Sequence, residues 1–178
     1  MAAGENERDG LKRLRAATHF ERGRHLFNAN RFEDALAAIE DAIAEDPEFV
    51  RAYTAKANAL TMLGRAYEAA AICDEVLAKD PNLALAYTTK ASALHRAGRT
   101  DEALENYRRG VELSPREHLT HYNFACFWAL EGNEAECEEC LRRALDIDPR
   151  AKPKAATDAD FASVRGREWF QELVALKI

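Results

Sequence analysis

Apolar and polar positions in this chain follow the rhythm of helices, and the rhythm itself repeats. Between Val50 and Met62, apolar residues such as Ala57 and Leu60 keep the 3.6-residue spacing of one buried helical stripe. Gly64 then predicts the end of that helix, and a second apolar set over residues 69–77 predicts another helix. No segment alternates strictly as a strand would, so the pattern predicts an all-helical chain.

A proline recurs every 34 residues and marks the boundary between successive helix pairs. Each proline follows an aspartate or a serine, which we expect to cap the next helix while the proline takes its first position. A fixed period of this length is typical of stacked repeats of one helical unit. The dipeptides are Asp46-Pro47, Asp80-Pro81, Ser114-Pro115 and Asp148-Pro149.

Positions 34 residues apart hold residues of the same kind. Small residues in three such columns predict close contacts between helices, and a fourth column holds residues that accept the left-handed conformation at a helix end. The small-residue columns are Gly23, Ala57, Ala91, Ala125; Ala35, Ala69, Ala103, Cys137; and Ala42, Val76, Gly110, Ala144. The turn column is Asn30, Gly64, Gly98, Gly132.

Composition and charge exclude several classes of function. The 178 residues are 47% hydrophobic and 31% charged, and no apolar run approaches the roughly 20 residues that span a bilayer, so we expect no membrane insertion. A net charge of −6 argues against nucleic-acid binding. The first 15 residues are polar and show no signal-peptide pattern, so a cytoplasmic location is expected.

The repeated pattern Ala57, Leu60, Gly64, Ala69, Pro81 resembles the tetratricopeptide repeat. The resemblance implies an all-α, right-handed superhelical solenoid of four helix-turn-helix repeats over residues 16–151. The expected repeats are residues 16–49, 50–83, 84–117 and 118–151.

The two ends of the chain are expected to differ from the repeats. Residues 1–15 form a polar segment, expected to be partly disordered or a helical cap. Residues 152–178 contain Asp158-Ala-Asp160-Phe161 and a later Phe170, which resemble the capping tails of small prokaryotic proteins of this family. A solenoid needs its last apolar face covered, so this segment is expected to cap the fourth repeat. Binding of a partner by the tail is the alternative.

The family resemblance implies a non-enzymatic adaptor whose first helices line a concave groove for a peptide or helix of another protein. Three groove arginines, Arg24, Arg51 and Arg96, favour an extended or acidic peptide on a protein that is acidic as a whole. Phe20 and Phe27 are expected to anchor it, or instead to pack under the N-terminal segment. The predicted groove residues are Phe20, Arg24, Phe27, Arg51, Thr54, Asn58, Thr61, Thr88, Ser92, His95, Arg96, Tyr122 and Asn123.

Two alternatives to the adaptor remain open. The chain could be a self-associating scaffold, hence a possible homo-oligomer, or it could resemble the chaperones of type III secretion translocators. The carboxylate clamp of heat-shock co-chaperones is not expected, because the clamp positions hold Phe20, Arg24, Ala55, Leu85 and Thr89.

Cys137-Glu-Glu-Cys140 raises the alternative of a metal or redox site, together with His118, His121 and Cys126. Cys137 falls in a small-residue column, and surrounding glutamates oppose thiolate formation, so buried structural cysteines are expected. No phosphate-binding loop or catalytic motif is present, and neither a metal nor a cofactor is expected.

Overall fold

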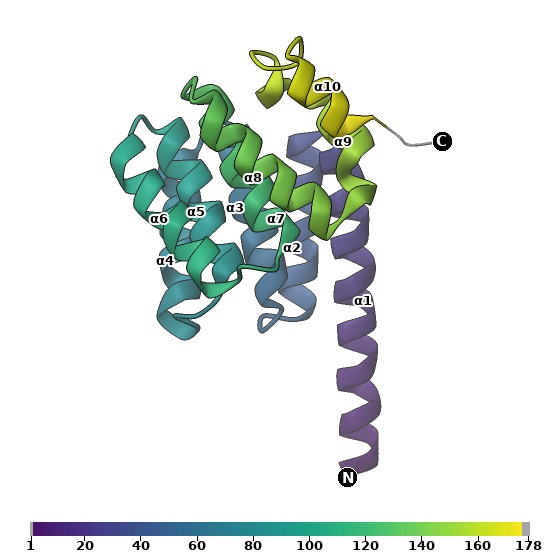
Figure 1. Cartoon of the computed structure of the whole chain (residues 1–178). Coiled ribbons are helices and arrows are strands. Elements are labelled where there is room, and N and C mark those ends of the chain that lie inside the picture. Colours follow the sequence, from purple (N-terminus) through teal and green to yellow (C-terminus); the bar gives the residue numbers. More distant parts are fainter. Residues whose placement is uncertain (1, 176–178) are drawn as a thin grey trace.

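The computed structural model describes residues 2–175, with side chains from residue 8 onward, and this part of the chain contains helices and no strand. Eight helices form four antiparallel pairs, and a short C-terminal segment follows them (Figure 1). The prediction of an all-α solenoid is confirmed. The pairs are α1 (Ala2–Asn28) with α2 (Phe32–Glu45), α3 (Val50–Met62) with α4 (Ala66–Lys79), α5 (Ala84–Arg96) with α6 (Thr100–Leu113), and α7 (His118–Leu130) with α8 (Glu134–Ile147). The C-terminal elements are η1 (Pro149–Ala151), α9 (Lys152–Thr157), η2 (Ala159–Phe161) and α10 (Glu168–Val174).

The turn inside each pair depends on one residue in the left-handed conformation. Asn30, Gly64, Gly98 and Gly132 have φ values of 57°, 77°, 78° and 74°, as the turn column predicts. This conformation costs glycine little, and asparagine tolerates it better than most residues do. The chain can therefore reverse within three residues and lay the second helix against the first.

The prediction that Asp-Pro caps the next helix is wrong for α3 and α5. The helix α3 begins at Val50, three residues after Pro47, and the Asp46 carboxylate instead accepts the Glu48 amide hydrogen at 3.1 Å. Asp80 forms the same short turn with Asn82. Only at the fourth boundary does Pro149 stand in the first position of a helix, the short η1.

The proline carbonyls have a second structural role in this fold. The Tyr53 hydroxyl donates to the Pro47 carbonyl at 3.0 Å, and the Tyr87 hydroxyl donates to the Pro81 carbonyl at 3.3 Å. In the fourth repeat the Nε2–H of His121 makes the equivalent bond to Pro115 at 2.9 Å. One column of rings thus fastens each first helix to the turn that precedes it.

The small-residue columns are the places where paired helices touch. Every member of these columns is buried. At Gly110 of α6, a side-chain carbon would lie 2.6 Å from the Thr88 methyl group and 3.3 Å from the Ala84 carbonyl oxygen. At Gly23 of α1, it would lie 2.7 Å from a carbon of Ile39. Larger residues at these positions would force the pairs apart.

The first helix is about twice as long as the other repeat helices. Its N-terminal part projects beyond α2, away from the body of the molecule (Figure 1). Leu11 and Leu14 on this extension are 50% and 64% exposed. Phe20 instead packs at a tilt against Phe49, with ring centroids 4.9 Å apart, so the alternative that it packs under the N-terminal segment is wrong. No helix within residues 2–175 is both long and apolar enough to cross a membrane.

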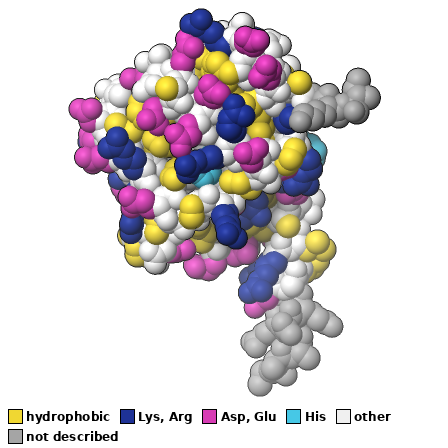
Figure 2. All heavy atoms as spheres, viewed as in Figure 1, with side chains coloured by type: hydrophobic (Ala, Val, Ile, Leu, Met, Phe, Trp, Pro, Cys, Tyr) yellow, Lys and Arg dark blue, Asp and Glu magenta, His cyan; other side chains and the backbone are white. Residues whose placement is uncertain are grey.

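The acidic residues of α2 are largely matched by neighbouring cations. Asp41 pairs with Arg22 of α1 at 2.8 Å, and Glu40 pairs with Lys56 of α3 at 2.8 Å. Acidic and basic side chains are also interspersed over the face of the molecule seen in Figure 2. These contacts are exposed and contribute little stability each, so the acidic cluster is a solvated outer face.

We expect Gly110→Ala to lower the free energy of unfolding by about 1–3 kcal/mol, because the new methyl group overpacks the contact with Thr88 and Ala84. Gly10→Ala is the matched control, since Gly10 also lies in a helix but has no atom within 4 Å of the added carbon. Urea unfolding followed by circular dichroism measures the free energy of unfolding of both variants. Equal stability of the two variants would contradict the close-packing account.

Candidate partner-binding groove

The first helices of the four pairs lie side by side, with contacts between α1 and α3, α3 and α5, and α5 and α7. Their inner face is the predicted groove. Arg24, Arg51 and Arg96 are exposed there. Five further predicted groove residues are half-buried on this face, namely Phe27, Asn58, Ser92, His95 and Asn123.

Three predicted groove residues are not available to a ligand. Thr54, Thr61 and Thr88 are at most 4% exposed, and each hydroxyl donates to a carbonyl of its own helix. Their prediction as ligand-contacting groove residues is therefore wrong. The reason is packing against neighbouring helices: the Thr88 methyl group, for example, fills the space beside Gly110 of the paired helix α6.

Two of the groove arginines already have partners within the chain. Arg24 forms an ion pair with Glu21 on the same helix at 2.9 Å. The Arg51 guanidinium lies over the ring of Phe20, 5.7 Å from its centroid, and Phe20 itself is only 6% exposed. Phe20 thus supports a cation and offers little apolar surface to a ligand.

His95 is held between α5 and α7. Its Nε2 lies 2.8 Å from a carboxylate oxygen of Glu131, and its ring packs edge-on against Phe127 at 4.9 Å. The predicted role of His95 as a ligand contact is therefore secondary to its role in joining two neighbouring repeats.

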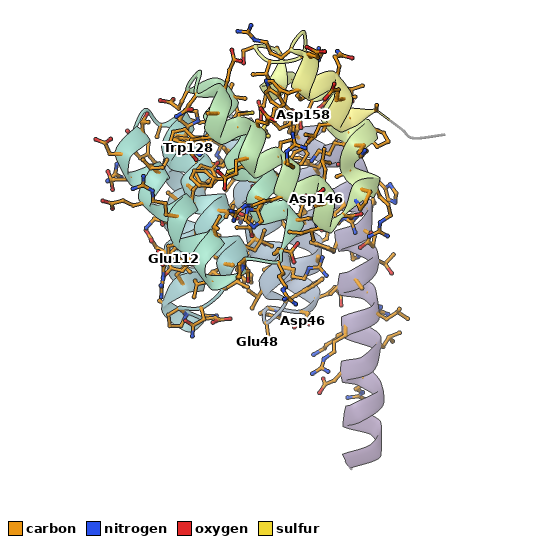
Figure 3. The ribbon with its side chains drawn as sticks, in the orientation of Figure 1. Asp46, Glu48, Glu112, Trp128, Asp146 and Asp158 are labelled. Carbon is orange, nitrogen blue, oxygen red and sulfur yellow. The ribbon has the colours of Figure 1, made fainter. Side chains whose placement is uncertain are left out.

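The C-terminal segment covers the inner face of the fourth repeat. We call residues 158–163 the strap. Asp158 lies where this segment meets the body of the repeats (Figure 3), and its carboxylate accepts the Tyr122 hydroxyl hydrogen at 2.8 Å. Phe161, fully buried, packs edge-on against Tyr122 at 5.6 Å, and the Ser163 hydroxyl donates to the Ala129 carbonyl. Tyr122 is 2% exposed, so its predicted role as a peptide anchor is wrong for this structure.

Two carboxylates and one thiol meet beneath the strap. One ligand atom each of Cys126, Asp158 and Asp160 lies within 4.8 Å of the other two. Burial, and then the Asp158 charge, raise the pKa of Asp160, while burial and both carboxylates raise the pKa of Cys126. The thiol therefore stays protonated at neutral pH, which is unfavourable for a metal ligand or a nucleophile.

Cys137 and Cys140 are buried on α8. Burial, followed by Glu134 and Glu138, raises the pKa of Cys137 to about 12. Burial and nearby glutamates raise the pKa of Cys140 to about 12 as well. Both thiols are protonated at neutral pH, in keeping with a packing role.

An open hollow of about 470 Å³ lies away from the groove, between the projecting part of α1 and the end of α2. Its walls carry Lys12, His19, Asp41 and Glu45. Asp41 and Glu45 pair with Arg22 and Arg15, so the charges at this hollow are largely matched from within the chain.

Comparison with known proteins assigns the family. Two models described as tetratricopeptide repeat match residues 20–84 and 72–105. The chain belongs to the tetratricopeptide-repeat proteins. A search of curated proteins gives no match.

Solved structures share the fold at low sequence identity. TTC0263, a thermophilic tetratricopeptide-repeat protein of Thermus thermophilus, is 20% identical with a TM-score of 0.67, over 89% of this chain and 80% of that chain. MamA from residue 41 to its end, of Desulfovibrio magneticus RS-1, is 17% identical with a TM-score of 0.53, over 76% of each chain. The first repeat domain of Spaghetti (RPAP3), bound to an HSP90 peptide, is 21% identical with a TM-score of 0.55, over 75% of this chain and 93% of that chain.

Asp158 and Asp160 are expected to affect stability in opposite directions. Asp158→Ala removes the acceptor of the Tyr122 hydroxyl, which leaves a buried donor and should lower the free energy of unfolding by about 1–3 kcal/mol. Asp160 binds its proton more tightly in the folded state, because its pKa is raised on folding. The negative charge of Asp160 therefore lowers the free energy of unfolding at neutral pH. Asp160→Asn removes this charge and should raise the melting temperature.

The effect of Asp160→Asn should shrink as the pH falls through the raised pKa of Asp160, where the native side chain becomes neutral too. Thermal melts at pH 7 and at acidic pH measure this. A melting temperature of Asp160→Asn below that of the unchanged protein at pH 7 would contradict the conclusion that the Asp160 charge destabilises the fold.

Proposed function

We propose that the protein is a non-enzymatic adaptor that binds a segment of a partner protein on the exposed inner face of α1, α3 and α5. The observation that supports this most is the contrast in charge between the two faces. Acidic residues of the outer helices are largely paired with cations. The inner face presents Arg24, Arg51 and Arg96, of which Arg24 is paired with Glu21. An acidic segment would complement this inner face.

The strap covers the inner face of the fourth repeat and so limits the surface available to such a segment. Because the strap covers Tyr122 and Cys126, a ligand would contact mainly the first three repeats. Asn58 and Ser92, both half-buried, are the polar groups that could bond its backbone. This ligand would be an extended or helical segment rather than a small molecule.

A structural relative supports peptide binding by this kind of surface. The Spaghetti (RPAP3) domain is bound to the HSP90 peptide SRMEEVD, which carries three acidic residues. Phe20, Ala55 and Leu85 stand at clamp positions of co-chaperones in the present chain. We therefore propose an acidic partner other than a heat-shock chaperone terminus, in the cytoplasm.

A self-associating scaffold is the second candidate, and the projecting part of α1 is the observation that favours it. Leu11 and Leu14 expose apolar surface on this projecting part. Sedimentation over a range of concentrations tests this candidate. A strict monomer, unchanged by Leu11→Gln and Leu14→Gln, would exclude it. A secretion chaperone would use the same inner face for an apolar client, and such a client should then co-purify.

Changing Arg24, Arg51 and Arg96 together to Glu should reduce partner capture from native lysate roughly ten-fold or more, because the inner face becomes acidic. The matched control changes Arg108, Arg109 and Arg142 to Glu on the second helices, with the same change in net charge. Quantitative mass spectrometry of captured proteins provides the comparison. Equal losses in both variants, or no loss in either, would contradict binding at the inner face.

A further inference from the structure

Four side chains form a row along one edge of the inner face, the edge where the first helices begin. Arg51, Leu85 and Leu119 are each the second residue of their helices, α3, α5 and α7. Lys154 of α9 lies against Tyr122 of α7 and so continues the row past α7. Arg51, Lys154 and Leu119 are exposed, Leu119 to 38%, and Leu85 is half-buried. We call these four residues the edge row.

The two ends of the edge row are cations, and each lies over an aromatic ring. Arg51 lies over Phe20 at 5.7 Å, and the Lys154 ammonium lies over Tyr122 at 4.7 Å. Phe20 and Tyr122 occupy the same position of the first and fourth repeats. Contact with a ring restricts where each cation can lie, which lowers the entropy lost when it binds an anion.

Both cations remain available for a ligand. Within the described residues, neither Arg51 nor Lys154 forms an ion pair of 4.0 Å or less with a carboxylate. The residues before α3 and α5, Phe49 and Leu83, make no side-chain capping bond, so these helix ends add positive potential along the same edge. Two carboxylates would therefore complement the ends of the row.

The spacing of the edge row defines the spacing of its ligand. Packed helices lie about 8–10 Å apart, and an extended segment in the polyproline II conformation completes one turn of three residues in about 9.3 Å. Side chains three residues apart on such a segment point to the same side and would thus face successive helices. The order along the row, from Arg51 through Leu85 and Leu119 to Lys154, is cation, apolar, apolar, cation.

We propose that the edge row binds a partner segment in the extended polyproline II conformation, in which two carboxylates flank two apolar side chains, each three residues from the next. This inference rests on the proposed function and specifies its partner. The carboxylates meet Arg51 and Lys154, and the apolar side chains cover Leu85 and Leu119. The C-terminal segment thus contributes one end of the binding surface through Lys154, in addition to covering the fourth repeat.

The test uses the full chain and a fluorescein-labelled peptide, Asp-Ser-Ser-Leu-Ser-Ser-Leu-Ser-Ser-Asp, with binding measured by fluorescence anisotropy. A control peptide of the same composition carries its two leucines side by side in the centre. The first peptide should bind at least about ten-fold more tightly, since only it can place one leucine over each helix. Absent binding, or equal affinity of the two peptides, would overturn the proposal.

Variants locate the bound peptide on the row. Arg51→Gln and Lys154→Gln should each weaken binding about five- to ten-fold through loss of a charged contact, whereas Arg108→Gln on α6 should leave it unchanged. Equal effects of all three would show nonspecific attraction and reject the edge row. If the peptide fails to bind while the triple arginine variant still loses its natural partner, this inference fails and the adaptor function stands.

Discussion

The close approach of paired helices at positions without bulky side chains is the constraint on which this structure depends. At Gly23 and Gly110 there is no room for even a methyl group without displacing Ile39 or Thr88. Each pair can close because a left-handed residue reverses the chain within three positions. The tight pair then stacks on the next pair, and stacking places four first helices side by side with one common inner face.

Much of the fold was predictable because the same residue pattern, with the same packing requirement, recurs in four helix pairs. The helix over residues 50–62, the left-handed turns and the buried columns are all local or periodic features. The Asp-Pro prediction failed because a short turn separates Pro47 from α3, and helix-capping preferences do not reveal that gap. Periodicity identifies equivalent positions, but it does not show which loop conformation joins them.

The candidate site was less predictable because its exposure depends on contacts between repeats and with the tail. Thr54 and Thr88 lie on the side of the first helices that the predicted stripe leaves open, yet neighbouring elements bury them. Tyr122 is covered by Asp158 and Phe161, which lie more than one period further along the chain. The charge of the inner face was visible in the sequence, whereas the stacking of Arg51 and Lys154 on rings required the structure.

The adaptor function requires a partner to occupy the inner face of the first three repeats. Amide hydrogen exchange of the protein with and without its captured partner tests it most directly. We expect slower exchange on partner binding in α1, α3 and α5, together with the start of α7, and no change in the outer helices α2, α4 and α6. Protection confined to the outer helices or to α10 would contradict it.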